Sequence, residues 1–302
     1  MTRLAALCRH ARCAFAAATA GLALLGAAVP ACADPALFVI KDADSTIYLL
    51  GTVHLLKPET VWRGPKLDAA FKLATELWLE LPTTNPAAMQ GEMMQLVARY
   101  GLSPAKRLSA RLTTDEMKTL DEAAKVAGLS GAQLDVFRPW FAALTISTAA
   151  ISRAGYDPES GVDGKVEAVF GERGIKPIGF ETAEQQIKVF ADMTEEQELE
   201  YLRSTMDDYD DAPTELDQMV VYWASGDIAN LEKIVVTDMK DKEPDLYQSL
   251  LVNRNANWVK KIQERLKGSG VSFIAVGAGH LIGPDSVLAM LRAKGVESSR
   301  VQ

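Results

Sequence analysis

Two stretches of the sequence decide the fold, Ile47-Tyr48-Leu49-Leu50-Gly51-Thr52-Val53-His54 and Val271-Ser272-Phe273-Ile274-Ala275-Val276-Gly277-Ala278-Gly279-His280. Each begins as an apolar run rich in β-branched and aromatic residues, which predicts a buried strand. Each ends in Gly-x-x-His, and signals for a helix follow over 65–74 and 284–294. A unit of strand, Gly-x-x-His and helix therefore occurs twice, more than 200 residues apart.

The two histidines are expected at one edge of a sheet. Ligands of open α/β sheets bind beyond the carboxyl ends of the strands, and glycine lets the backbone turn sharply there. Imidazoles that converge at that edge form either a metal pair or an acid–base pair. A lone histidine in such a place is more often a core residue with a satisfied hydrogen bond. Two histidines in the same motif favour the functional interpretation.

Two glutamates also lie where strands are expected to end. Glu80 stands at the carboxyl end of an alternating strand over 75–81, level with the histidines. Glu181 follows a strand over 176–180 and opens a helix. The alternatives are an exposed edge-strand position for Glu80 and simple stabilisation of a helix dipole by Glu181.

The first 33 residues have the composition of a cleavable signal peptide. Three arginines precede an apolar run over 14–29, and Ala31-Cys32-Ala33 matches the small-x-small cleavage site. A lipoprotein acylated at Cys32 is less favoured, because Pro30 stands where such sites carry a small or aliphatic residue. Cleavage would remove all three cysteines, so we expect an exported protein, periplasmic or secreted, without disulfides.

The composition is that of an ordinary globular protein. The chain has 302 residues, of which 48% are hydrophobic and 24% charged, with a formal net charge of −8. This acidic balance argues against nucleic acid as a partner, since phosphate binding needs a basic surface. After the signal peptide no apolar run is long enough to span a membrane.

The predicted fold class is α/β, with one domain over 34–302. A small mixed sheet is expected from strands at 37–41, 46–50, 75–81, 176–180 and 271–276. A large helical insertion over about 85–267 is expected to cap the carboxyl edge of this sheet, and the unit of strand, Gly-x-x-His and helix lies at both ends of the domain. Nucleotide phosphate loops and Gly-x-Ser-x-Gly elbows are absent from the sequence, which disfavours those chemistries.

Several of these residues follow one another in an order that resembles the TraB/GumN family. The landmarks are Tyr48 to His54, Glu80, Gly179-Phe180-Glu181-Thr182 with Gln185, Arg254-Asn255, and Gly277 to His280. The resemblance extends from about residue 37 to the C-terminus. That family groups with the Tiki-type membrane proteases, which carry two Gly-x-x-His motifs and depend on metal.

The resemblance implies an exported metal-dependent hydrolase that cleaves peptide bonds. A divalent metal ion would be held by His54, His280 and a glutamate, and the position of Glu80 beside His54 makes it the expected ligand. Glu181 would then act as the general base. This ligand set does not distinguish Mn, Co, Zn and Fe.

The same resemblance assigns Arg254 and Asn255 to the site. Arg254 would point inward and pair a carboxylate or hold a substrate carboxylate, and Arg254 or Asn255 would stabilise developing negative charge. Asp163 lies in a Gly-x-Asp segment often found in the family. We expect it to cap a helix, and the alternative is that it orients a ligand.

A second class of function is kept open. The same cleft can bind haem, metal, a small molecule or a peptide without catalysing a reaction, because function depends on the site and not on the fold. The expected partner is thus a peptide or small-molecule ligand in either case.

Overall fold

The computed structural model describes residues 34–82 and 86–302, so the expected signal peptide lies outside the described residues. These residues form a six-stranded mixed sheet with the order β4-β3-β5-β2-β1-β6. The strands are β1 (Leu37–Lys41), β2 (Ser45–Thr52), β3 (Glu76–Leu79), β4 (Ile178–Gly179), β5 (Gly270–Gly277) and β6 (Ser298–Arg300). The predicted α/β class is confirmed.

Parallel pairing joins β4, β3, β5 and β2, while β1 and β6 complete the sheet with antiparallel pairing. The two motif-bearing strands, β2 and β5, are direct neighbours, and Gly51 pairs with Val276 and Thr52 with Gly277. The carboxyl ends of parallel strands meet at one edge of a sheet. The residues that follow these strands are therefore brought to the same edge.

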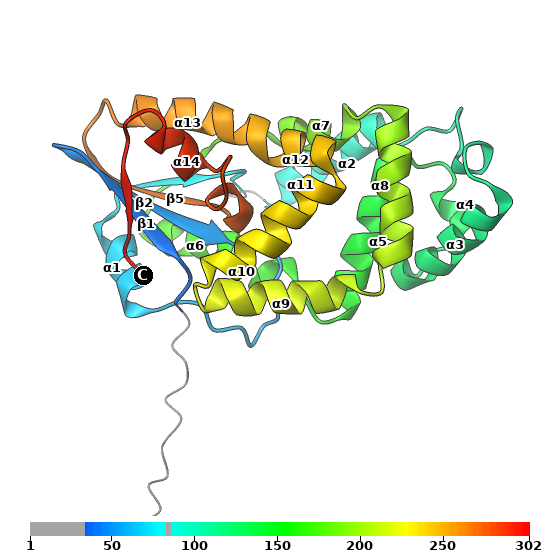
Figure 1. The fold of residues 1–302 in the computed structure, drawn as a ribbon, viewed down its shortest axis with the longest axis horizontal. Coiled ribbons are helices and arrows are strands. Elements are labelled where there is room, and N and C mark those ends of the chain that lie inside the picture. The colour runs from blue at the N-terminus through cyan, green and yellow to red at the C-terminus, as the bar shows by residue number, and fades with distance from the viewer. Residues whose placement is uncertain (1–33, 83–85) are drawn as a thin grey trace, which may run out of the picture. The chain divides into compact units, whose positions relative to one another are not determined.

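Helices surround this sheet (Figure 1). Most of them lie, in sequence, between β3 and β5. The α-helices of the described residues are α1 (Pro65–Leu73), α2 (Pro86–Tyr100), α3 (Thr114–Ala124), α4 (Gly131–Leu134), α5 (Pro139–Arg153), α6 (Val162–Gly171), α7 (Ala183–Ala191), α8 (Glu195–Asp208), α9 (Ala212–Ala224), α10 (Ile228–Glu232), α11 (Asp238–Lys242), α12 (Pro244–Tyr247), α13 (Asn253–Arg265) and α14 (Val287–Arg292). None of them is long and apolar enough to cross a membrane.

Successive side chains of β5 pack alternately into the hydrophobic cores on the two faces of the sheet. Phe273 packs with Phe71 of α1 and Phe170 of α6 in one core cluster. Ile274 packs in another cluster with Trp258 of α13 and with α14. Further clusters hold the helical insertion together, around α3, α5 and α8 and around α2, α5 and α7. The sheet is thus covered on both sides, as its apolar strands require.

The structure corrects three details of the sequence prediction. Strand β6 was not expected, because Ser298–Arg300 is short and polar and pairs only at the sheet edge. The last helix begins at Val287, not Pro284, because the Ser286 side chain caps it by accepting from Ala289 N–H. The helical insertion expected over about 85–267 is not α-helical directly before α13, where it forms a π-helical turn, η5 (Gln248–Val252).

Gly51 lets the two motif-bearing strands approach each other closely. A Cβ on Gly51 would lie 2.9 Å from Ala278 Cα and 3.1 Å from Ala278 Cβ. The indole of Trp223 in turn donates to Gly51 O over 2.7 Å in the core. A side chain at this position would therefore push the turn that carries His280 away from β2.

We predict that Gly51→Ala destabilises the protein by about 1–3 kcal/mol, because the new methyl group overlaps the backbone of Ala278. The matched control is Gly91→Ala in α2, where a Cβ meets no atom within 4 Å. That change should stabilise the helix by roughly 0.5–1 kcal/mol. Urea unfolding of both variants measures the difference, and equal effects would contradict the packing described here.

Candidate functional site

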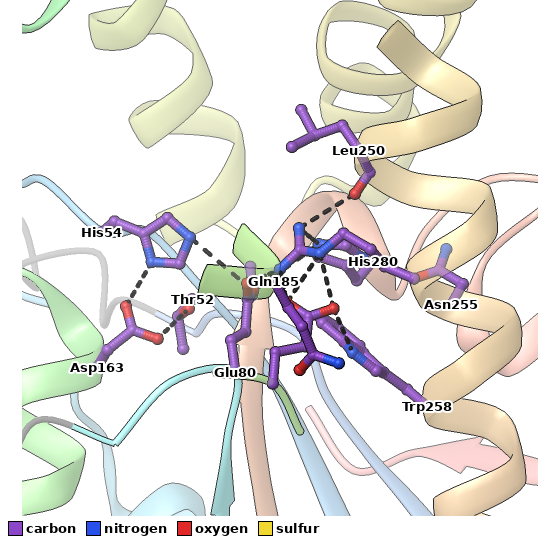
Figure 2. A network of polar contacts seen from close by, with 12 residues as sticks. Thr52, His54, Glu80, Asp163, Gln185, Leu250, Asn255, Trp258 and His280 are labelled. Carbon is purple, nitrogen blue, oxygen red and sulfur yellow. Dashed lines mark hydrogen bonds and ion pairs between the residues drawn. The ribbon is translucent and has the colours of Figure 1, made fainter. Parts of the chain in front are cut away.

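The site lies where four neighbouring strands of the described sheet end. His54 follows β2, Glu80 follows β3, Glu181 follows β4 and His280 follows β5. The helix α13 crosses the same edge and supplies Arg254 and Asn255. The structure thus brings every site residue expected from the sequence into one network of hydrogen bonds and ion pairs (Figure 2).

Arg254 is the centre of this network. Its Nη2 donates to Glu80 Oε2 over 2.6 Å and to Glu181 Oε2 over 2.8 Å. Its Nε donates to both oxygens of Glu181 over 3.0 Å. All three side chains are about nine-tenths buried. A single guanidinium therefore compensates two buried carboxylates, a pairing that bidentate arginine geometry suits.

The charges around Glu80 keep it ionised. Burial by itself would raise the pKa of Glu80. The neighbouring imidazoles, the Arg254 charge and the Gly277 N–H, which donates to Oε1 over 2.6 Å, outweigh that penalty and lower the pKa to about 2. Arg254 keeps its proton for the same reason, since its bonds with Glu181 and Glu80 raise its pKa against the effect of burial.

His280 is held in one tautomer by Asn255. The Asn255 amide nitrogen donates to Asp285 O over 2.8 Å, so its oxygen faces the ring and accepts from His280 Nδ1 over 2.6 Å. The proton is therefore on Nδ1, and the Nε2 lone pair accepts from Arg254 Nη1 over 3.1 Å. Burial, aided by the charge of Arg254, lowers the pKa of His280 to about 3 and keeps the ring neutral.

His54 is oriented in the same way from the other side. Asp163 Oδ2 accepts from His54 Nδ1 over 2.8 Å, while its Oδ1 accepts from the Thr52 hydroxyl over 2.9 Å. The His54 side chain is 60% exposed. Partial desolvation by the surrounding protein opposes the charged form, but the bond to Asp163, with the charges of Asp163 and Glu80, raises the pKa of His54 to about 9. Asp163 does not cap a helix as expected, because Gly161 is the N-cap of α6 and makes no side-chain cap.

Both imidazoles direct Nε2 toward one carboxylate oxygen. His54 Nε2 lies 3.9 Å and His280 Nε2 3.8 Å from Glu80 Oε1, with Glu80 between the two rings (Figure 2). They meet beside Gly277, where a Cβ would lie 3.2 Å from His54 Nε2 and 3.1 Å from Glu80 Oε1. The absence of a side chain at Gly277 leaves room at this meeting point.

These residues have the chemistry that a divalent metal ion needs. Each imidazole donates a hydrogen bond from Nδ1 to an oxygen and directs Nε2 toward Glu80, as metal-binding histidines usually direct their free nitrogen to the metal. As they stand, the described residues do not include a group of three or more His, Cys, Asp or Glu arranged to hold a metal ion. Arg254 occupies the His280 Nε2 lone pair, so metal binding there would exchange this hydrogen bond for a metal bond.

A cavity of about 400 Å³ opens onto this cluster. His54, Glu80, Asp163 and Arg254 form part of its lining. Apolar side chains of the lining are Leu81, Val189, Phe190 and Leu250, and the remaining lining residues are Pro158, Gly164, Glu167 and Gln186. A volume of this size accepts a side chain and its adjoining backbone groups.

Glu181 lies in the cluster but is not among the residues that line this cavity. Besides its bonds to Arg254, its Oε1 accepts from the indole of Trp258 over 2.9 Å. Gln185, in the next turn, belongs to a capping box with Thr182 that begins α7. These contacts hold Glu181 in place as the partner of Arg254; its role as general base stays a prediction.

Sequence reasoning missed Trp258 and the bond between Asp163 and His54. Trp258 lies one helical turn after Arg254 and Asn255 on α13, and its ring centre is 4.3 Å from that of His280. The i, i+4 spacing from Arg254 was the available signal. For Asp163 no sequence spacing predicts a bond to a histidine 109 residues away.

Comparison with known proteins places these motifs in a family. A sequence model of the TraB/PrgY/gumN family matches residues 36–300, a range that contains both histidines and both glutamates. A protein of Treponema pallidum (strain Nichols), described only as uncharacterised, is 20% identical over 268 residues, which cover 84% of this chain and 79% of that protein. No solved structure is significantly similar to the chain.

We predict that Arg254→Met destabilises the protein by about 3–5 kcal/mol at neutral pH, because two buried carboxylates lose their cation. Glu80 stabilises the wild type above its ordinary pKa of 4.5, and this contribution is lost as the pH falls toward about 2. The difference between wild type and variant should therefore shrink as the pH falls from 4.5 toward 2. Urea unfolding across this pH range tests it; a difference independent of pH would contradict the pairing.

Proposed function

Because the chain belongs to the TraB/PrgY/gumN family, we propose that it is an exported metal-dependent hydrolase that cleaves peptide bonds. The observation that carries the proposal is the shared direction of His54 Nε2 and His280 Nε2 toward Glu80 Oε1. Export is supported by the arginines and the Ala31-Cys32-Ala33 site at the N-terminus.

The proposed metal ligands are His54, Glu80 and His280. A divalent ion held by them would supply a Lewis acid for hydrolysis. Asp163 and Asn255 would fix the rings so that both Nε2 atoms are available. Two imidazoles and a carboxylate suit Mn, Co, Zn and Fe alike.

Arg254 supplies the positive charge of the proposed reaction site. It lines the cavity and stays protonated beside its carboxylate partners. A fixed guanidinium at this place would stabilise negative charge that develops on a carbonyl oxygen of the substrate. Asn255 contributes through His280 rather than by touching substrate, since both ends of its amide are bonded within the protein.

A ligand-binding protein without turnover is the second candidate. It is favoured by the bond from Arg254 Nη1 to His280 Nε2, which completes the hydrogen bonding of the cluster with no metal present. Metal-dependent cleavage of peptides by the wild-type protein separates the two candidates.

We predict that His54→Ala, His280→Ala and Glu80→Gln each lose most of the metal bound by wild-type protein, because each removes one ligand. Isothermal titration with Mn²⁺, Co²⁺, Zn²⁺ and Fe²⁺ measures this binding, on protein prepared without a histidine tag. Cleavage of a random peptide library in the presence of the bound metal measures activity.

Glu181→Gln is the matched control, since it changes a carboxylate of the same cluster outside the proposed ligand set. It should keep the metal. Loss of metal by Glu181→Gln together with its retention by Glu80→Gln would reverse the two roles. Failure of the wild type to bind any of these ions would support the second candidate.

We predict that metal affinity rises about tenfold for each pH unit between about pH 6 and pH 8. His54 has a pKa of about 9, so its proton must leave before Nε2 can bind a metal. One proton should therefore be released per ion bound below that pKa. Titrations in two buffers of different ionisation enthalpy count the released protons, and zero release near pH 7 would exclude His54 as a ligand.

A further inference from the structure

We propose that the substrate is an extended peptide, and that a large apolar side chain beside the reacting bond binds Leu81, Val189, Phe190 and Leu250. We call these four residues the apolar lining. This inference rests on the proposed function, since it names the substrate class of the same site.

The apolar lining faces the cavity that also contains His54 and Glu80. Its side chains are half-buried, so each leaves apolar surface exposed inside a concave site. Covering such surface with an apolar group releases water and favours binding by roughly 25 cal/mol for each Å² removed from water. A charged or small side chain would leave this contribution unused.

The lining is held in place before any ligand arrives. The ring of Phe190 stacks on that of Trp140, with ring centres 5.9 Å apart, and on that of Tyr201, with ring centres 6.0 Å apart. Leu81 and Phe190 pack against the same core cluster of α2, α5 and α7. A preformed lining loses little conformational entropy on binding and can therefore select among side chains.

A second cavity indicates that the ligand is longer than one residue. It has a volume of about 470 Å³ and shares Val189 with the first cavity. Both cavities are lined by α7 together with η5 and the start of α13. Charged side chains and the amides of Gln197, Gln248 and Asn253 line the second cavity. Gln197 Nε2 donates to Asp245, and Gln248 Nε2 donates to Asn253 Oδ1 over 2.8 Å, so the amides are held in place by bonds within the protein. The lining of this second cavity is therefore mostly polar, and it suits the polar backbone of a peptide that continues from the apolar lining.

The test compares two matched valine changes. Val189→Asp places a carboxylate in the apolar lining, whereas Val221→Asp places one on α9, where Val221 is 63% exposed. Val189→Thr keeps the side-chain volume and guards against a folding defect, and thermal unfolding followed by circular dichroism checks all three variants.

The first arm is cleavage of a random octapeptide library by protein supplied with Mn²⁺, Co²⁺, Zn²⁺ or Fe²⁺ in turn. We expect Leu, Met or Phe to be enriched next to the cleaved bond. Val189→Asp should lower kcat/KM for such peptides by about tenfold or more, Val189→Thr less, and Val221→Asp by less than about twofold. Cleavage without an apolar preference, or equal effects of the two aspartates, would overturn the inference and leave the proposed function intact.

The second arm measures binding of the same library in EDTA, by ultrafiltration and mass spectrometry of the retained peptides. Retention of apolar peptides by wild type and its loss in Val189→Asp would support the apolar lining even if no metal gave cleavage, and in that case the proposed hydrolase would fail alone. Absence of both cleavage and selective retention would overturn the inference. Selective retention of small molecules from a metabolite mixture, with no peptide retained, would also overturn it.

Discussion

Burying two carboxylates at the end of a sheet is costly unless a cation accompanies them, and in this protein the cation is Arg254. Its guanidinium contacts Glu80, Glu181, His280 and the carbonyl of Leu250. Three of these partners follow the ends of β3, β4 and β5, and Leu250 lies in the π-helical turn before α13. The position of α13 over the sheet edge is therefore tied to the charge balance of the site, and the same contacts hold the catalytic candidates in register.

The hydrogen bonds around the histidines orient both rings in the same way, with Nδ1 bonded to a protein oxygen and Nε2 facing the site. Asp163 accepts from His54 and Asn255 accepts from His280, so neither Nε2 needs a protein donor to fix its ring. Arg254 donates to the lone pair of His280 Nε2. A proton occupies that of His54 Nε2, because Glu80 and Asp163 favour the charged ring. A metal ion would thus displace an existing proton and an existing hydrogen bond, which makes binding an exchange rather than the filling of a gap.

Local patterns predicted most of the fold and the membership of the site. The apolar runs before His54 and His280 predicted buried strands, and the ends of the strands that precede Glu80 and Glu181 placed the carboxylates at the same edge. What local patterns could not predict was which of these groups bond to one another. The bond of Asp163 to His54 and the choice of Arg254 as partner of both glutamates depend on packing between elements 73 to 174 residues apart. The π-helical turn that precedes Arg254 was equally hidden, because a one-residue insertion leaves the apolar pattern of a helix nearly unchanged.

The central claim is that His54 and His280 together bind one metal ion. X-ray absorption fine structure of the cobalt-loaded, untagged protein counts imidazole ligands directly, because the ring carbons scatter at characteristic distances. We expect two imidazoles and at least one oxygen donor per cobalt in the wild type. A spectrum with one imidazole, or with oxygen ligands alone, would contradict it.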